Sequence, residues 1–155
     1  MKPSNPKHAI GETKAPLHLV PAVTKIFSSI AHFLGKVKYG AWNWRAAGVS
    51  ASTYKAALER HMDRWWEGEE FDPVDGTPHL ANALACINIL IEGFYRGNIN
   101  DDRPPSTNLQ PAHDMAEKLM AEIKERYKDK NPVHYTISSE IDGRTSLKVN
   151  SNEGN

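Results

Sequence analysis

The chain has 155 residues, enough for one domain with a hydrophobic core. Its 19 basic and 19 acidic side chains give a formal net charge of +0, so composition offers no general attraction for a nucleic acid polymer or an acidic membrane surface. The single cysteine excludes an internal disulfide, and no segment reaches the roughly 20 apolar residues of a membrane span. With no apolar signal stretch after Met1, we expect a cytoplasmic protein.

The N-terminal third is predicted to hold one helix between two irregular segments. Residues 1–16 are rich in proline and poor in large apolar groups, which predicts a flexible arm. Apolar residues then recur at helical spacing over about 21–34, with Pro21 suited to the first turn and Gly35 to the end. Residues 35–52 have no clean period and are predicted to form a structured loop.

Two further helices are predicted on either side of a turn-rich link. The first spans about 53–67 and ends at Gly68, and the second spans about 78–96. Thr77 is suited to cap the second of these helices, with Pro78 in its first turn. Residues 78–96 are apolar nearly all round, which predicts a central helix of a bundle or a helix at a subunit interface.

The C-terminal part is predicted to be a helix followed by a hairpin or a disordered tail. After a linker over 97–111, apolar residues at helical spacing predict a fourth helix over about 112–128. Alternation around Asp142-Gly143 is typical of a β-hairpin, although an isolated two-stranded ribbon is marginally stable. The chain is therefore predicted to be all-α, with an arm over 1–16, a helical domain over 17–110 and an extension over 111–155.

Two histidines are predicted on core-facing sides of neighbouring helices. His79 shares a helix face with Asn82 and Cys86, and His61 lies on the apolar stripe of the preceding helix. Helices joined by a short link usually lie antiparallel, so both imidazoles are expected to approach one pocket. An unsatisfied buried polar group costs roughly 1–3 kcal/mol, so something should bind them. The alternative is that each ring only bonds a backbone group.

The link between these two helices is acidic. Glu69, Asp72 and Asp75 precede a helix N-terminus, whose partial positive charge suits phosphate. Carboxylate oxygens are the ligands that Mg²⁺ and Mn²⁺ prefer, and these ions commonly bind together with substrate phosphates. The sequence therefore suggests a metal site here, with a solvated acidic loop as the alternative.

The predicted loop over 35–52 carries groups suited to a nucleotide base. Tyr39 and Trp44 offer flat rings for stacking, and Asn43 offers an amide for the base edge. The alternative is that these rings only cover a small core. The candidate phosphate-binding cations are Lys38, Arg60 and Arg103, the last of which is placed to reach another subunit.

Two rival chemistries have weaker support. His113-Asp114 is the dipeptide of HD-type phosphohydrolases, which also need a further histidine and a distant aspartate. Cys86 lies in an apolar helix, where burial raises a thiol pKa and makes it a poor nucleophile. No glycine-rich phosphate loop is present in the sequence.

A set of short motifs between about Leu17 and Leu90 resembles a known family, the dATP/dGTP diphosphohydrolase N-terminal domain, which is grouped with the MazG-like all-α nucleotide pyrophosphohydrolases of phages and bacteria. Asp102-Arg103-Pro104 is similar to the end of that domain. The motifs are Lys38-Tyr39-Gly40, Asn43-Trp44, Arg60-His61, Gly68-Glu69, Asp72-Pro73, Gly76 and Pro78-His79-Leu80.

The resemblance implies metal-dependent hydrolysis of a purine deoxynucleoside triphosphate, dGTP or dATP, to the monophosphate and pyrophosphate. Mg²⁺ or Mn²⁺ is the implied cofactor, and a homo-oligomer with sites formed partly between subunits is implied as the assembly. On this basis His61, Asp72 and His79 are the candidate catalytic residues. The candidate metal ligands are Glu69, Asp72 and His79, and the candidate nucleotide-binding residues are Lys38, Tyr39, Asn43, Trp44, Arg60 and Arg103.

The chain departs from the wider superfamily at its helical carboxylates. MazG-like enzymes generally carry Glu-x-x-Glu and then Glu-x-x-Asp on successive helices, whereas the second motif would fall here at His79-Leu80-Ala81-Asn82. Metal would therefore need a different ligand set that includes the histidines. The alternative function is a non-catalytic nucleotide-binding or oligomerisation protein on the same scaffold.

Overall fold

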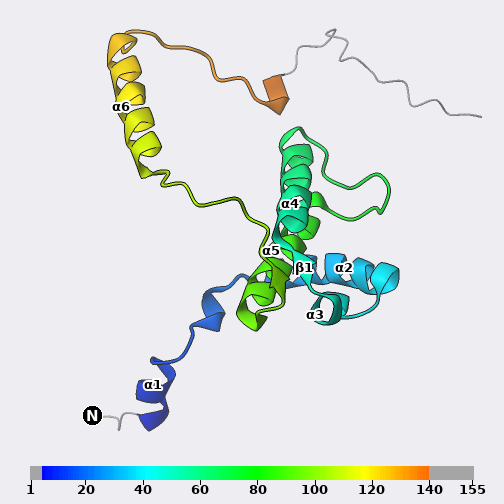
Figure 1. Cartoon of the computed structure of the whole chain (residues 1–155). Helices are drawn as coiled ribbons and strands as arrows, with labels where there is room; N and C mark the ends of the chain where they lie inside the picture. The colour runs from blue at the N-terminus through cyan, green and yellow to red at the C-terminus, as the bar shows by residue number, and fades with distance from the viewer. Residues whose placement is uncertain (1–4, 140–155) are drawn as a thin grey trace, which may run out of the picture. The chain divides into compact units, whose positions relative to one another are not determined.

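The computed structural model describes residues 5–139, which are built mainly from helices (Figure 1). This confirms the predicted all-α class. By its contacts the chain divides into two units, Met1–Pro104 and Pro105–Asn155. The α-helices are α1 (Pro6–Gly11), α2 (Ala22–Tyr39), α3 (Asn43–Ala47), α4 (Ala51–Trp66), α5 (His79–Arg96) and α6 (Gln110–Arg126).

The first unit is organised around α5, which packs against both α2 and α4. Small side chains make up most of the buried surface and let the three helices approach closely. Several larger residues of α5, such as Leu80, Ile87 and Ile91, stay at least one-third exposed. The buried apolar residues are Ala31, Ala51, Ala81, Ala83, Ala85, Cys86 and Ile89.

A short parallel strand pair, which periodicity did not predict, joins two ends of the helical core. β1 (Val49–Ser50) pairs with β2 (Ile99–Asn100), so the segment before α4 lies beside the segment after α5. Asp102 continues this connection, because its carboxylate accepts bonds from the Ser52 backbone N–H at 2.8 Å and the Ser52 hydroxyl at 2.5 Å. The first of these bonds satisfies a backbone N–H in the first turn of α4 that the helix itself leaves free.

The main differences from the predicted elements lie at helix ends. Gly35 does not end the first long helix; α2 continues to Tyr39, and Gly40, at φ 91°, follows it. Because Gly35 costs only about 1 kcal/mol in a helix interior, the apolar period through Val37 prevails. Residues 43–47, predicted as loop, form α3, and the predicted flexible arm contains α1.

Two predicted local features also differ in the structure. Thr77 makes no side-chain bond to the α5 N-terminus; its hydroxyl instead accepts from Asn82 Nδ2 at 2.9 Å. No strand forms over 133–137, where the chain is irregular before a 3-10 turn at Ile137–Ser139. The Asp142-Gly143 turn of the predicted hairpin lies outside the described residues. Within residues 5–139, no helix combines the length and apolar character needed to cross a membrane.

Gly48 is expected to be one of the least replaceable residues of the core. It has φ 71°, and an added Cβ would lie 2.8 Å from the Asn98 carbonyl oxygen. We expect Gly48→Ala to lower the free energy of unfolding by about 2 kcal/mol or more, because a steric clash adds to the cost of left-handed backbone. Urea denaturation measures this loss. Gly97→Ala is the matched control, since Gly97 has φ 68° and open space around its Cβ position; equal losses would contradict the clash.

Candidate functional site

The two histidines predicted to converge do meet, between α4 and the first turn of α5. His61 Nδ1 lies 2.9 Å from His79 Nδ1, and the ring centroids are 5.2 Å apart. His79 is 0% exposed, and His61 is partly buried. Burial, together with the neighbouring His79, lowers the pKa of His61. His61 is therefore biased toward the neutral imidazole, the form that binds a metal or accepts a proton.

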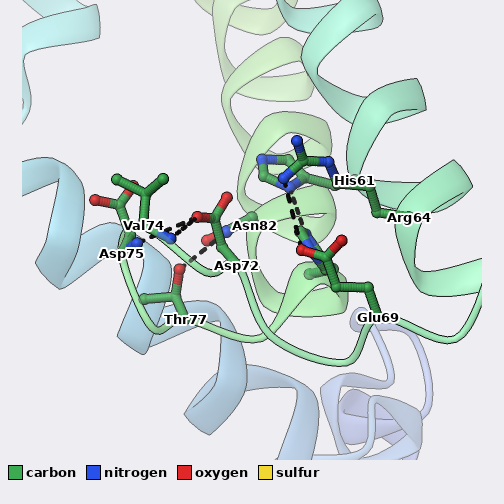
Figure 2. A network of polar contacts seen from close by, with 9 residues as sticks. His61, Arg64, Glu69, Asp72, Val74, Asp75, Thr77 and Asn82 are labelled. Carbon is green, nitrogen blue, oxygen red and sulfur yellow. Dashed lines mark hydrogen bonds and ion pairs between the residues drawn. The ribbon is translucent and has the colours of Figure 1, made fainter. Parts of the chain in front are cut away.

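The loop between α4 and α5 is folded around Asp72, as Figure 2 shows. The Asp72 backbone N–H donates to the Thr77 carbonyl at 2.8 Å, and the Asp72 carbonyl accepts from Gly76 N–H at 2.8 Å. Asp72 Oδ1 accepts from the backbone N–H groups of Val74 at 2.9 Å and Asp75 at 3.1 Å. The side chain is thereby held in one orientation.

These bonds also set the charge of Asp72. Burial acts to raise its pKa, but the N–H groups of Val74 and Asp75 outweigh that effect and hold the pKa below its usual value. Among the hydrogen bonds of residues 5–139, Oδ1 is the oxygen engaged, which leaves Oδ2 available to a ligand. Asp72 is therefore an ionised carboxylate with one free oxygen.

His61, Asp72 and His79 form a group with the chemistry of a metal site. One ligand atom from each lies within 4.8 Å of the other two. Two imidazole nitrogens and one carboxylate oxygen are all donors for divalent cations. Two of the three residues come from different helices and the third from the link between them, so packing of α4 on α5 brings the group together.

Glu69, assigned to the metal on sequence grounds, has a different position. Its Oε1 lies 3.1 Å from His79 Nε2, on the side of the ring that faces away from His61. Arg64 approaches the same oxygen at 3.6 Å. A carboxylate on Nε2 keeps a proton there and leaves the Nδ1 lone pair of His79 free. Glu69 thus orients a candidate ligand instead of joining the group of three.

A cavity of about 260 Å³ opens beside His61, between α2, α3, α4 and α5. Four residues that the sequence assigned to nucleotide binding, Lys38, Tyr39, Asn43 and Trp44, line it together with His61. The loop reaches the same cavity through Asp75. The residues expected from sequence to hold a base and a phosphate therefore share one cavity with a candidate metal ligand.

Lys38 joins α2 to the loop at the edge of this cavity. Its Nζ lies 3.0 Å from Asp75 Oδ1 and 2.9 Å from Asp75 Oδ2. This hydrogen bond raises the pKa of Lys38, so the ammonium stays charged. Its ion pair is partly exposed, and such pairs contribute only about 0–1 kcal/mol to stability. An incoming phosphate can therefore displace Asp75 at little cost.

Trp44 is held in the cavity wall by residues that the sequence did not single out. Its Nε1 donates to Glu92 Oε2 at 2.6 Å, and its ring packs against His32 and Trp42, each with a centroid 5.3 Å away. Glu92 also pairs with Arg45, and hydrogen bonds from Arg45 and Trp44 lower the Glu92 pKa. The signal available in the sequence was the sole carboxylate of α5.

The comparison with known families covers the same region. Residues 4–103 match the family model described as dATP/dGTP diphosphohydrolase, N-terminal. The chain belongs to this family. Its matched region includes α1 to α5, the group of His61, Asp72 and His79, and the cavity beside it. No curated protein and no solved structure matches the chain.

Arg60 and Arg103, the other two candidate phosphate-binding cations, lie within the diphosphohydrolase family match but do not line the cavity. Arg103, the last matched residue, binds Asp101 through Nε at 2.6 Å and a terminal nitrogen at 2.7 Å. Its guanidinium also lies 4.8 Å from the centre of the Phe94 ring. Arg60 is exposed on α4, close enough for its charge to contribute to the lowered His61 pKa. The structure brings neither to the group of three.

The rival chemistries gain no support from the described residues. His113 and Asp114 lie on α6, beyond the diphosphohydrolase family match, and Asp114 accepts from Gln110 at 2.8 Å. Over residues 5–139, the group of three residues that could hold a metal ion, His61, Asp72 and His79, contains neither of them. Cys86 is buried, and burial raises the pKa of its thiol, as expected for an unreactive core cysteine.

The lowered His61 pKa predicts a pH dependence for metal-free protein. Because the folded pKa lies below that of an unfolded histidine, the unfolded chain binds a proton first as the pH falls. We expect the free energy of unfolding to be unaffected well above pH 6.5 and to decrease as the pH falls from about 6.5 toward the folded pKa. Urea denaturation at pH 7.5, 6.5 and 5.5 measures this slope. His61→Gln should reduce it, with His32, whose pKa burial also lowers, as the source of what remains; an unchanged slope would exclude His61 as a source.

Proposed function

We propose that the chain hydrolyses a purine deoxynucleoside triphosphate, dGTP or dATP, to the monophosphate and pyrophosphate. Family membership supports the reaction class. The proposal rests mainly on the position of His61. This residue belongs to the group with Asp72 and His79, and it also lines the cavity that contains Lys38 and Trp44. A triphosphate bound at the group places its sugar and base toward that cavity.

The cavity has room to extend for a nucleotide. Its wall residues His32 and Trp44 also line a second hollow of about 600 Å³ between α2, α3 and α5. Together the two spaces fall in the range of roughly 300–1,000 Å³ that is usual for small-molecule sites. The Trp44 ring offers a stacking surface, and Asn43 offers an amide for the base edge.

Mg²⁺ or Mn²⁺ is the divalent cation expected for such a reaction, and a donor set with two imidazoles fits Mn²⁺ better than Mg²⁺. His61, Asp72 and His79 would hold it, because their donor atoms lie within 4.8 Å of one another and Asp72 is ionised. A bound divalent cation supplies Lewis-acid neutralisation of the triphosphate charge and lowers the pKa of a nearby water. Glu69 keeps His79 in the tautomer that presents Nδ1.

The remaining chemistry is assigned to residues of the cavity edge. Water attacks the α-phosphorus, the bond from this phosphorus to the α,β-bridging oxygen breaks, and pyrophosphate leaves with the bonding electron pair. Lys38 moves from Asp75 to a phosphate oxygen and offsets the developing negative charge. The Asp75 carboxylate, freed from its ion pair, accepts the proton of the attacking water.

We further propose that the chain acts as a homo-oligomer. Six apolar residues of α2 are each 39–68% exposed and lie along one face of the helix. Together they expose on the order of 600 Å², at the upper end of the largest patches on ordinary monomers. In a symmetric dimer, the α2 stripe of a second copy of the chain packs against this stripe and buries both. The six residues are Val23, Ile26, Phe27, Ile30, Phe33 and Val37.

The experiment that tests the reaction is incubation of the full chain with each deoxynucleoside triphosphate and either Mg²⁺ or Mn²⁺, with separation of the phosphate products. Pyrophosphate together with dGMP or dAMP is the expected result. Release of intact triphosphate would favour the HD-type chemistry. Thermal stabilisation by nucleotide without any product would favour the alternative of a non-catalytic nucleotide-binding protein.

A further inference from the structure

The two histidines of the site face each other through the same ring atom. His61 Nδ1 and His79 Nδ1 are 2.9 Å apart, while His79 Nε2 faces Glu69 Oε1 at 3.1 Å. With the His79 proton held on Nε2, its Nδ1 carries a lone pair, so in metal-free protein His61 Nδ1–H donates to it. A cation that binds both Nδ1 atoms needs only a shift of the His61 proton to Nε2, with no net proton lost.

The separation of the two nitrogens is compatible with one coordination geometry more than with another. Metal–imidazole bonds are about 2.1 Å long, so two cis ligands of an octahedron lie about 3.0 Å apart, whereas two ligands of a tetrahedron lie about 3.4 Å apart. The 2.9 Å separation, which in metal-free protein is that of the hydrogen bond between the rings, is close to the octahedral edge, so both nitrogens can bind one ion in cis positions with little movement. Asp72 lies within 4.8 Å of both rings and can complete one face of the octahedron by a small inward movement.

The donor types indicate which ions this geometry selects. Mg²⁺ prefers oxygen ligands and gives up its water reluctantly, so two imidazoles are poor ligands for it. Imidazole nitrogen binds first-row transition ions more tightly, in an order that places Co²⁺ above Fe²⁺ and Fe²⁺ above Mn²⁺. Two histidines with one carboxylate, and other positions open, is the ligand set of six-coordinate Fe²⁺ sites.

We propose that His61, His79 and Asp72 form one face of a six-coordinate site that selects a transition ion, Mn²⁺, Fe²⁺ or Co²⁺, over Mg²⁺. This rests on the proposed function only for what occupies the open positions, which the triphosphate oxygens and water would fill. Glu69 is a positioning residue, because it acts on the ion through the ring of His79. Arg64 in turn lies 3.6 Å from the Glu69 oxygen.

Direct metal binding tests this selectivity without any nucleotide. Full-length protein stripped of metal is titrated with MgCl₂, MnCl₂ and CoCl₂ in a calorimeter, and the visible absorption of the Co²⁺ form is recorded. We expect one site per chain, with Co²⁺ and Mn²⁺ at least about tenfold tighter than Mg²⁺, and weak absorption typical of six-coordinate Co²⁺. Equal affinity for Mg²⁺, no binding of any ion, or the intense absorption of tetrahedral Co²⁺ would overturn the proposal.

Variants connect the binding to these residues. His61→Ala and His61→Gln should lose the Co²⁺ site, and Glu69→Gln should weaken it by roughly 10–100-fold. His113→Ala, which removes an exposed histidine of α6, is the matched control and should bind as the wild type does. Because His79 is fully buried, its replacement is left aside, and thermal unfolding of each His61 variant verifies the fold. Retained Co²⁺ affinity in both folded His61 variants would overturn the assignment.

The result of the metal-binding experiment can be distinguished from the result of the test for pyrophosphate release. Selective Co²⁺ binding that depends on His61, with no pyrophosphate released from any nucleotide, would support the site and refute the reaction. Pyrophosphate release with Mg²⁺ that survives in His61→Ala would support the reaction and refute the site.

Discussion

Replacing Asp72 with asparagine is expected to abolish pyrophosphate release from dGTP and dATP while the helical fold remains. The amide oxygen of asparagine can still accept the N–H groups of Val74 and Asp75 that hold the loop, so the substitution removes mainly the negative charge. Loss of a residue that only orients a metal ligand costs about 10–100-fold, so loss of a ligand itself should reduce kcat/KM by at least about 100-fold.

The control for the Asp72 variant replaces an aspartate outside the site. Asp63 is exposed on α4, two residues from His61 and on another side of the helix. Asp63→Asn should therefore retain wild-type kcat/KM, measured by pyrophosphate release under the same conditions. Circular dichroism of both variants verifies the fold. If Asp72→Asn stays fully active while folded, the group of three is not the reaction centre.

The part of the site that could be predicted follows from helix periodicity. His61 and His79 each lie on a helix face that the apolar pattern assigns to the core, and a short link implies antiparallel helices. Their meeting at 2.9 Å is the direct consequence of these two facts. Family motifs then identified Lys38 and Trp44, which line the adjoining cavity. Periodicity and motifs were sufficient because these residues all lie on helices of the first unit.

The roles of the acids could not be predicted in the same way. Glu69 and Asp72 are three residues apart in one irregular loop, and composition makes them equivalent ligands. Backbone bonds decide between them: Asp72 folds the loop around its own carboxylate, whereas Glu69 extends behind His79. Glu92 was missed because its partner Trp44 is 48 residues away along the chain. Side-chain direction in a loop, and pairing over such a separation, depend on tertiary packing.

The end of α2 gives a similar example for the fold. Local propensity placed the helix end at Gly35, but the helix continues to Tyr39 and ends before Gly40. The last turn of α2 carries Lys38, so this extension is what places the ammonium next to Asp75 at the edge of the cavity. A helix that ended at Gly35 would have no such geometry. The tertiary contact, which the sequence pattern does not contain, therefore determines a functional position.

The second large expected effect is on oligomer assembly and concerns the apolar face of α2. Ile26 and Val37 are both more than 60% exposed on that face, about three helical turns apart, and line neither hollow of the site. We expect the double variant Ile26→Glu/Val37→Glu to convert an oligomer into a monomer of 17.3 kDa, measured by light scattering after size exclusion. Each buried apolar side chain contributes about 1.5–3 kcal/mol, so losing two should weaken association by roughly 1,000-fold or more.

The control must change charge on the same helix without touching the stripe. Lys25→Glu does this, because Lys25 is exposed but is not one of the six apolar residues. It should leave the mass of the wild-type assembly unchanged. A wild type of 17.3 kDa across all concentrations would refute the oligomer. Dissociation matters for the site as well, because α2 carries His32 and Lys38 in the cavity wall, and Phe33 of the stripe lines the larger hollow. If the monomeric double variant keeps full metal affinity but loses pyrophosphate release, the second copy acts on the nucleotide side of the site and not on the histidines.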